Sequence, residues 1–143
     1  MEPTPRLPPP TSVRIVRAEP SLNAINLLHD RLATSVLLFM AAVGIWGLVT
    51  FLRGGSLSGS LAGALAIGQG LIAVQVLAGV ALLFVGRRPI DPTHYLYGAT
   101  AILVLPFAWS YLRSRDARLA LLYYSLITLF VAGLAIRGMT TAQ

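Results

Sequence analysis

The charged residues of this chain stand in short clusters separated by long uncharged runs. Four such runs hold 21, 33, 21 and 18 residues, bounded by Arg31 and Arg53, by Arg53 and Arg87, by Asp91 and Arg113, and by Arg118 and Arg137. A helix needs about 20 mainly apolar residues to cross a hydrocarbon core of about 30 Å. Only 11% of the 143 residues are charged, far fewer than a soluble domain of this size carries. The runs therefore predict four transmembrane helices, at about 22–52, 61–85, 92–112 and 119–136.

The connections between these runs are short and rich in turn residues. They read "RGGSLSGS", "GRRPID" and "RSRDAR". Connections of a few residues make neighbouring helices antiparallel. We expect an all-α membrane protein, an antiparallel up-down-up-down four-helix transmembrane bundle over residues 21–138, with a short tail at 139–143. Residues 1–20, rich in proline and arginine, have no apolar core of the signal-peptide kind and predict an extended or disordered arm.

The net charge of +6 comes from arginines that sit at the ends of the spans. In that position arginine meets lipid head groups, so the sequence predicts a lipid bilayer as partner and no nucleic acid. The chain has no cysteine, which excludes disulfides, iron–sulfur clusters and covalently attached haem. A non-covalent haem, or no cofactor, remains.

The chain has two histidines, one near the start of the first predicted span and one in the first turn of the third. Asp91 is predicted to cap that third helix, which places His94 close behind it. Spans one and three run in the same direction, so His29 and His94 should lie on one side of the membrane, on diagonal helices. Such a pair can hold a haem iron by bis-histidine ligation. Histidine also favours the membrane interface without binding anything, and this alternative stays open.

Cations are expected near a haem because its propionates carry negative charge. Arg31 follows His29 by two positions, and Arg87 and Arg88 stand just before His94. These three arginines are the predicted propionate contacts. Each also fits the role of an interfacial anchor.

Polar and small residues inside the second and third runs need partners. Gln69 and Gln75 must face protein, water or a ligand rather than lipid. Pro106 frees the carbonyl of Ile102 and predicts a kink. Small side chains allow close approach of a helix or a flat ligand, and helix packing is the expected use of a stripe made of Gly59, Gly63, Ala66 and Gly70.

The segments "HDRLATSVLLFMAAVG" and "IAVQVLAGVALLFVGRRPIDPTHYLYGATAILVLP" resemble the four-helix repeat of haem A synthase over about residues 23–138. The shared pattern is a histidine followed by arginine, a glutamine a few residues before a glycine, and a histidine followed by small residues. It reads here as His29 with Arg31, Gln75 with Gly79, and His94 with Gly98 and Ala99. The resemblance implies that His29 and His94 are axial ligands of one b-type haem, and that Gln75 belongs to its site.

Two departures from that family change the expected function. The family has two such halves in tandem, whereas this chain has one, which suggests a homodimer or a subunit of a larger membrane complex. The family places a glutamate three residues before the first histidine, where this chain has Asn26. An amide cannot exchange a proton as a carboxylate does, so no catalytic residue is predicted.

The sequence therefore predicts an integral membrane b-type haem protein in electron transfer. One alternative is a cofactor-free structural or assembly subunit of a membrane energy-converting complex. Another is a haem-modifying enzyme acting as a dimer. The arginines of residues 1–20 favour a cytoplasmic N-terminus. The resemblance instead implies a bacterial-type inner membrane with the histidine side extracytoplasmic, and we follow the resemblance.

Overall fold

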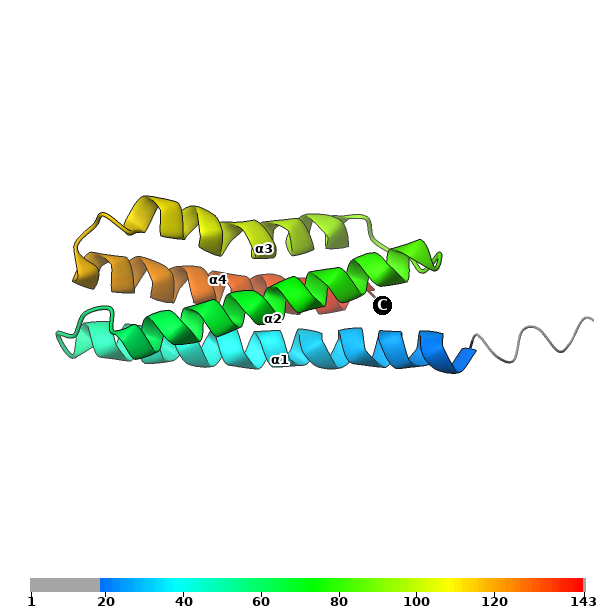
Figure 1. Cartoon of the computed structure of the whole chain (residues 1–143), viewed down its shortest axis with the longest axis horizontal. Helices are drawn as coiled ribbons and strands as arrows, with labels where there is room; N and C mark the ends of the chain where they lie inside the picture. Colours follow the sequence, from blue (N-terminus) through cyan, green and yellow to red (C-terminus); the bar gives the residue numbers. More distant parts are fainter. Residues whose placement is uncertain (1–18, 143) are drawn as a thin grey trace, which may run out of the picture.

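The computed structural model describes residues 19–142, which form four α-helices and no strand (Figure 1). The helices are α1 (Glu19–Leu52), α2 (Gly59–Phe84), α3 (Thr93–Leu112) and α4 (Ala117–Ala142). All four are long and apolar enough to cross a membrane. The chain reverses direction at each connection, so α1 and α3 begin at the same end (Figure 1). Most of the predicted arm, residues 1–18, lies outside the described part of the chain.

Two glycines end the first two helices. Gly54 and Gly86 both adopt φ of +83°, a left-handed conformation that side chains with a Cβ disfavour. The N–H that follows each glycine donates to a carbonyl five residues back, that of Thr50 at 2.9 Å or that of Leu82 at 3.0 Å. This arrangement satisfies carbonyls that the helix end would otherwise leave open. The turns "RGG" and "VGRR" therefore stop the helices where the sequence predicted.

Side-chain oxygens start the next three helices. The hydroxyl of Ser58 accepts from the Leu61 N–H at 3.3 Å, and the carboxylate of Asp91 accepts from the Thr93 N–H at 2.9 Å. Asp116 accepts two N–H groups of the first turn of α4, at 3.0 and 3.1 Å. Each cap satisfies donors that the first turn leaves open. Asp91 accepts an N–H at the start of α3 as predicted, but the helix begins at Thr93 with Pro92 in the N-cap position, one residue later than expected.

Two helices extend beyond the predicted spans. Helix α1 begins at Glu19 rather than at residue 22, because Pro20 fits the first turn of a helix, where no N–H is needed. Helix α4 continues to Ala142 instead of ending at residue 136 before a tail. Its last turn is stabilised by the hydroxyls of Thr140 and Thr141, which both donate to the Arg137 carbonyl at 2.9 Å. The Thr141 carbonyl also accepts the Asp91 N–H at 3.4 Å, which ties the end of α4 to the start of α3.

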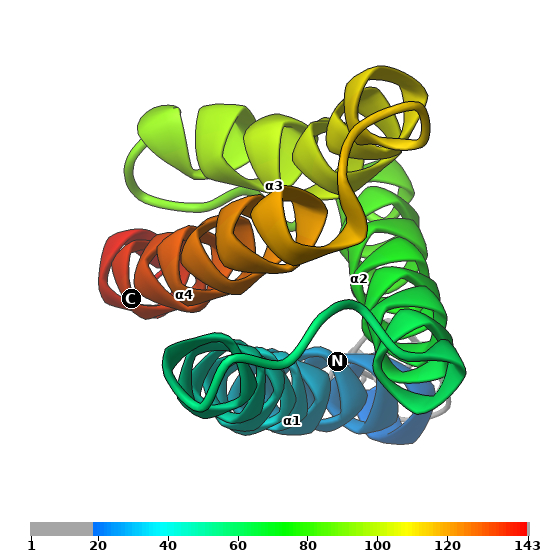
Figure 2. The ribbon, with the colours of Figure 1, turned by 90° about the vertical axis from the view of Figure 1, so that its left-hand side faces the viewer.

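The four helices form a ring in which each helix packs against two neighbours (Figure 2). Helices α1 and α4 share the most extensive contact, and α2 and α3 the least. Gly44 and Gly47 allow the close approach of α1 to α4. A Cβ at Gly44 would come within 2.9 Å of the Thr128 hydroxyl, and one at Gly47 would overlap the Ser125 side chain. Because each helix contacts its two neighbours in the ring, α1 and α3 lie opposite each other across it.

The predicted stripe of small residues on α2 does not pack inside the bundle, contrary to expectation. Cβ atoms built at three of its glycines would meet nothing within 4 Å in the described chain. The exposed stripe is the predicted one, Gly59, Gly63, Ala66 and Gly70. Close helix contacts are made instead by Gly44 and Gly47 of α1 and by the buried Gly68 of α2, where a Cβ would lie 2.7 Å from the Met40 sulfur.

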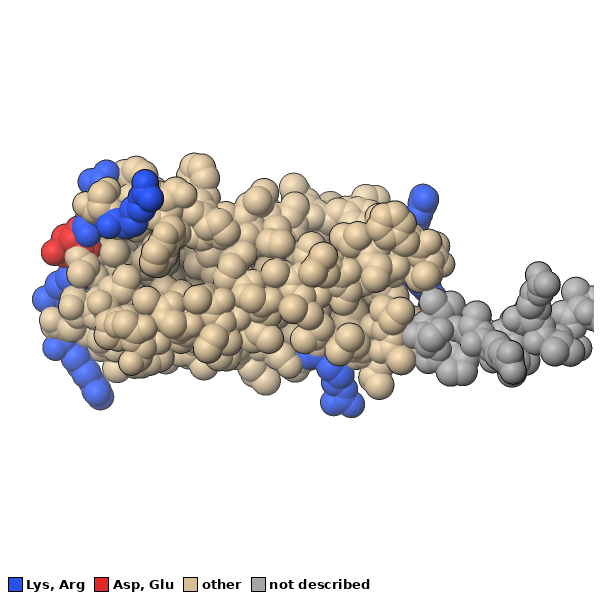
Figure 3. All heavy atoms as spheres, in the orientation of Figure 1, with Lys and Arg blue, Asp and Glu red and all other residues tan. Residues whose placement is uncertain are grey.

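Large apolar side chains cover the outside of the molecule. Phe84 is 87% exposed and Phe107 is 79% exposed, whereas the core holds small and medium side chains such as Met40, Leu121 and Val131. Arginine side chains gather mainly near the two ends of the long axis, with a largely uncharged surface between them on the face drawn in Figure 3. A soluble protein rarely exposes so large an apolar surface, and this one indicates contact with a lipid bilayer.

Candidate functional site

The two histidines lie side by side at the end of the ring where α1 and α3 begin. The centroids of the His29 and His94 rings are 6.1 Å apart, and the ring planes are inclined by 56°. They are 65 residues apart in the chain. The reversals of the chain bring them together, because both stand near the starts of helices that run in the same direction (Figure 1). The prediction that the two histidines share one end of the molecule is confirmed.

His94 is held in a defined tautomer by α4. Its Nδ1 lies 2.9 Å from the carbonyl oxygen of Gly138. A carbonyl only accepts, so Nδ1 carries the hydrogen and Nε2 of the neutral ring carries the lone pair. A hydrogen bond from the ring nitrogen that does not bind the metal is what orients histidine ligands in metal sites. The lone pair of His94 Nε2 is therefore available to a hydrogen-bond donor or to a metal ion.

The backbone ahead of His94 is fixed by Asp91. The Asp91 carbonyl accepts the His94 N–H at 3.1 Å, while its carboxylate accepts the Thr93 N–H. The bonds from Thr93 hold the pKa of Asp91 below its usual value, and the nearby positive charge of Arg137 lowers it further. Asp91 is therefore an ionised cap at neutral pH, and it holds the first turn of α3 in place.

His29 packs against two residues of α2 that stand one turn apart. Its Nε2 lies 3.4 Å from Nε2 of Gln75. A Cβ built at Gly79 would lie 3.2 Å from Cε1 of His29, which is closer than the ordinary carbon–carbon contact of about 3.5–4.0 Å. Glycine at position 79 therefore leaves the space that the imidazole occupies.

The contact between His29 and Gln75 leaves polar atoms without partners. Within residues 19–142, four buried side-chain polar atoms lack a hydrogen bond, and two of them are Nδ1 of His29 and Oε1 of Gln75. Exchanging the oxygen and nitrogen of the Gln75 amide reverses the direction of its bond to His29 but still leaves one atom of each side chain unpaired. Buried polar atoms are normally hydrogen-bonded. Nδ1 of His29 and Oε1 of Gln75 can therefore each form a bond for which the described protein supplies no partner.

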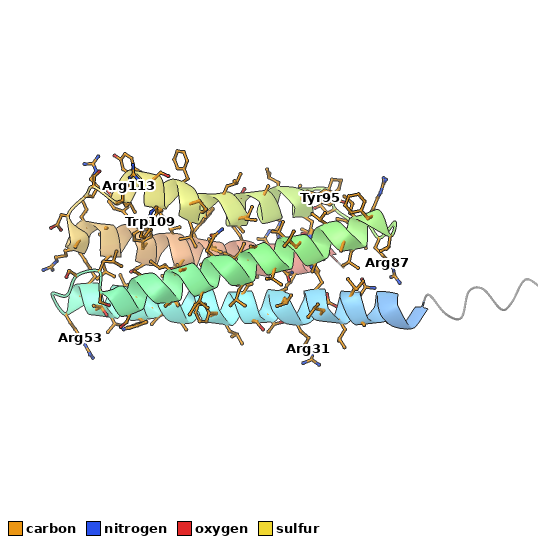
Figure 4. All side chains as sticks on the ribbon, in the orientation of Figure 1. Arg31, Arg53, Arg87, Tyr95, Trp109 and Arg113 are labelled. Atoms are coloured by element: carbon orange, nitrogen blue, oxygen red, sulfur yellow. The ribbon has the colours of Figure 1, made fainter. Side chains whose placement is uncertain are left out.

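Of the three predicted propionate contacts, Arg31 is turned away from the histidines. It points outward from α1, away from the other three helices (Figure 4). The reason is helix geometry, since two residues correspond to roughly 200° around a helix with 3.6 residues per turn. Arg87 and Arg88 are exposed in the turn between α2 and α3. The structure thus joins His29, Gln75 and His94 and leaves the arginines at the periphery.

Gln69, the other polar residue of α2, is bonded elsewhere. Its amide Nε2 donates to the Ile102 carbonyl at 3.0 Å. This is the carbonyl that Pro106 frees, because proline has no N–H to donate four residues back. The sequence identified the donor and the acceptor separately but not their pairing. The bond joins α2 to α3 and serves the packing of the bundle.

The two imidazoles are neighbours, but Nε2 of His29 contacts Nε2 of Gln75 and is not directed at a position shared with His94. No group of three or more His, Asp or Glu side chains within residues 19–142 could hold a metal ion by itself. Two protein ligands suffice for a haem iron, because the porphyrin supplies the other four. The unpaired atoms and the tautomer of His94 fit the same use.

No protein-family model, no curated protein and no solved structure matches this chain. The resemblance to the haem A synthase repeat therefore rests on the residue pattern of His29, Gln75, Gly79 and His94. The His29 ring links the other three, since it neighbours Gln75 and Gly79 of α2 and the His94 ring of α3.

Proposed function

We propose that this chain is a multi-pass membrane protein that holds a b-type haem between His29 and His94 and takes part in electron transfer. The observation that supports it best is the pair of imidazoles whose centroids are 6.1 Å apart. In one of them, His94, the bond from Nδ1 to the Gly138 carbonyl leaves Nε2 as the nitrogen with the lone pair. Four candidate spans support the membrane location, and their alternating directions support an antiparallel up-down-up-down bundle.

Each residue of the site has a stated part in this proposal. When bound, the haem supplies an iron that changes oxidation state by one electron. Gly138 keeps Nδ1 of His94 protonated, so Nε2 would be the nitrogen of His94 that holds the haem. Gln75 orients the ring of His29 through the amide, and Gly79 leaves room for that ring. The surrounding apolar helices keep water away, which influences the potential of a metal centre.

A cofactor-free structural or assembly subunit is the second candidate function. The 3.4 Å contact between Gln75 and His29 favours it, because a histidine that bonds only within the protein needs no ligand. The third prediction, a haem-modifying enzyme, has less support. Asn26 still offers only an amide one turn before His29, where proton transfer would require an acid or base.

The test is a reduced-minus-oxidised visible spectrum of the full chain, expressed with ample haem and purified in mild detergent. We expect a b-type band that both His29→Ala and His94→Ala abolish. The matched control is Ser110→Ala, which removes an exposed hydroxyl near the other end of α3 and should leave the band unchanged. A colourless parent protein would overturn the haem proposal and leave the structural subunit.

Two further parts of the proposal concern the surroundings of the chain. The histidine end faces out of the cytoplasm of a bacterial-type inner membrane, and reporter fusions at the α2–α3 turn and at the α3–α4 turn test this. The chain works as a homodimer or as a subunit of a larger membrane complex. Mass measurement of the purified detergent complex, with identification of co-purifying chains, tests that part.

A further inference from the structure

A shallow groove of about 410 Å³ lies at the turn between α2 and α3. Its lining is Leu83, Arg88, Pro89, Pro92 and Tyr95, so it is apolar apart from one guanidinium group and one phenol. Tyr95, at the start of α3, marks this end of the molecule in Figure 4. The groove lies on the outer surface. Its lining includes Arg88, which the sequence analysis had linked to a haem propionate.

The position of the groove is the boundary between apolar helices and water. The span of α2 ends at Phe84 and that of α3 begins at Thr93, so the turn between them lies where lipid head groups begin. Leu83 is 40% exposed and Tyr95 is 45% exposed, so both are accessible from the outside. A ligand in this groove would have one end in lipid and one in the head-group layer.

The charge around the groove is positive. Arg88 lines it and Arg87 precedes Arg88 in the same turn. Asp91 is the acidic residue of this turn, and its carboxylate is already engaged by the Thr93 N–H. The groove therefore complements an anion, and the Arg88 guanidinium can bind a phosphate by donating two parallel hydrogen bonds.

The helices beside the groove leave an apolar seam. Helices α2 and α3 are the least closely packed neighbours in the ring. Pro89 and Pro92 have no N–H to offer, so the floor of the groove favours apolar chains over polar ligands. An acyl chain can lie along this seam, while a polar molecule would lose its bonds to water there.

We propose that an anionic phospholipid binds in this groove, with its phosphate on Arg88 and an acyl chain against Leu83 and Tyr95. The proposal is independent of haem, since the groove lies outside the ring of helices that holds His29. It assigns Arg88 to lipid instead of to a haem propionate.

The experiment is native mass spectrometry of the full chain released from detergent with added lipid. Phosphatidylglycerol and phosphatidylcholine with the same acyl chains are compared for the parent, Arg88→Gln and Arg31→Gln. Arg31 is the matched control, because it is an exposed arginine that points away from the other helices. We expect Arg88→Gln to weaken retention of phosphatidylglycerol by about tenfold, as loss of a charge-assisted bond implies, and Arg31→Gln to leave it unchanged.

Three results would overturn the proposal. One is equal retention of phosphatidylcholine, and another is an equal loss in Arg31→Gln, which would indicate attraction to the whole surface. The third is displacement of the lipid by inorganic phosphate alone, which would show a site for free phosphate. Melting curves of each variant in the same detergent separate lost binding from lost folding. Arg88→Lys, which keeps the charge but not the fork, should retain lipid at an intermediate level.

Discussion

A single methyl group at Gly79 tests the packing on which the histidine site depends. In Gly79→Ala the new Cβ would lie 3.2 Å from Cε1 of His29 and 3.8 Å from its Nδ1. Ordinary contact begins at about 3.5 Å, so the ring must move by a few tenths of an ångström. Against this small strain, alanine is favoured over glycine within a helix by up to about 1 kcal/mol. We therefore expect a melting temperature equal to or above that of the parent protein, together with a displaced His29 ring.

The assay is ¹⁵N NMR of protein labelled only at histidine. The chain has two histidines, so the spectrum contains few signals and each is assigned by one substitution. We expect Gly79→Ala to shift the ring signals of His29, and Gly79→Val to shift them further. If the haem proposal holds, the same variants weaken or shift the visible band.

The matched control is Gly70→Ala on the same helix, where a Cβ would meet nothing within 4 Å in the described chain. It should give the same gain in helix stability and leave the histidine signals in place. Unchanged His29 signals in Gly79→Ala, or equal shifts in Gly70→Ala, would refute the reasoning.

Three further predictions concern the bundle. Gln69→Leu leaves the Ile102 carbonyl without its donor and should lower the free energy of unfolding by about 1–3 kcal/mol, measured by denaturation in detergent. Gly47→Leu overpacks the contact of α1 with α4 and should cost about 1–3 kcal/mol, whereas Gly63→Leu on the open face of α2 should cost little. Because the pKa of Asp91 lies below its usual 3.8 in the folded protein, its charged form stabilises the fold at neutral pH, and this contribution is lost as the pH falls through the folded value. Asp91→Ala should therefore melt below the parent at pH 7, and the difference should vanish in strong acid.

The turns between α1 and α2 and between α2 and α3 were predictable because their signals are local. Gly54 and Gly86 accept a left-handed conformation, and Asp91 offers a carboxylate two residues before Thr93. The proximity of the histidines was predictable from topology, since helices that alternate in direction bring His29 and His94 to one end.

The rotation of each helix about its own axis was not predictable. A soluble amphipathic helix shows which side is buried by its polar face, but these helices are apolar on all sides. The sequence therefore gave no reason to prefer Gly44 and Gly47 over the stripe that begins at Gly59 as the close contact. The buried face became known only from how α1 meets Thr128 on α4.

The bond to His94 was missed for a related reason. Every residue has a carbonyl, so nothing in the sequence singles out that of Gly138. The predicted fourth helix also ended at residue 136, two residues short of it. The extension of α4 to Ala142, supported by the hydroxyls of Thr140 and Thr141, places this carbonyl beside α3.

The distribution of polar bonds inside the bundle argues for a ligand at the histidines. The buried serine and threonine hydroxyl groups of α4 donate hydrogen bonds to carbonyls of their own helix, as Ser125 does to the Leu121 carbonyl at 2.7 Å. Two of the four unpaired buried atoms in residues 19–142 flank a single long contact, that of His29 with Gln75. Unpaired polar atoms are costly in an apolar interior, so a partner that bonds to His29 recovers free energy that the protein alone leaves unused. A cofactor held by the two histidines would be such a partner, and the ring of helices would be more stable with it than without it.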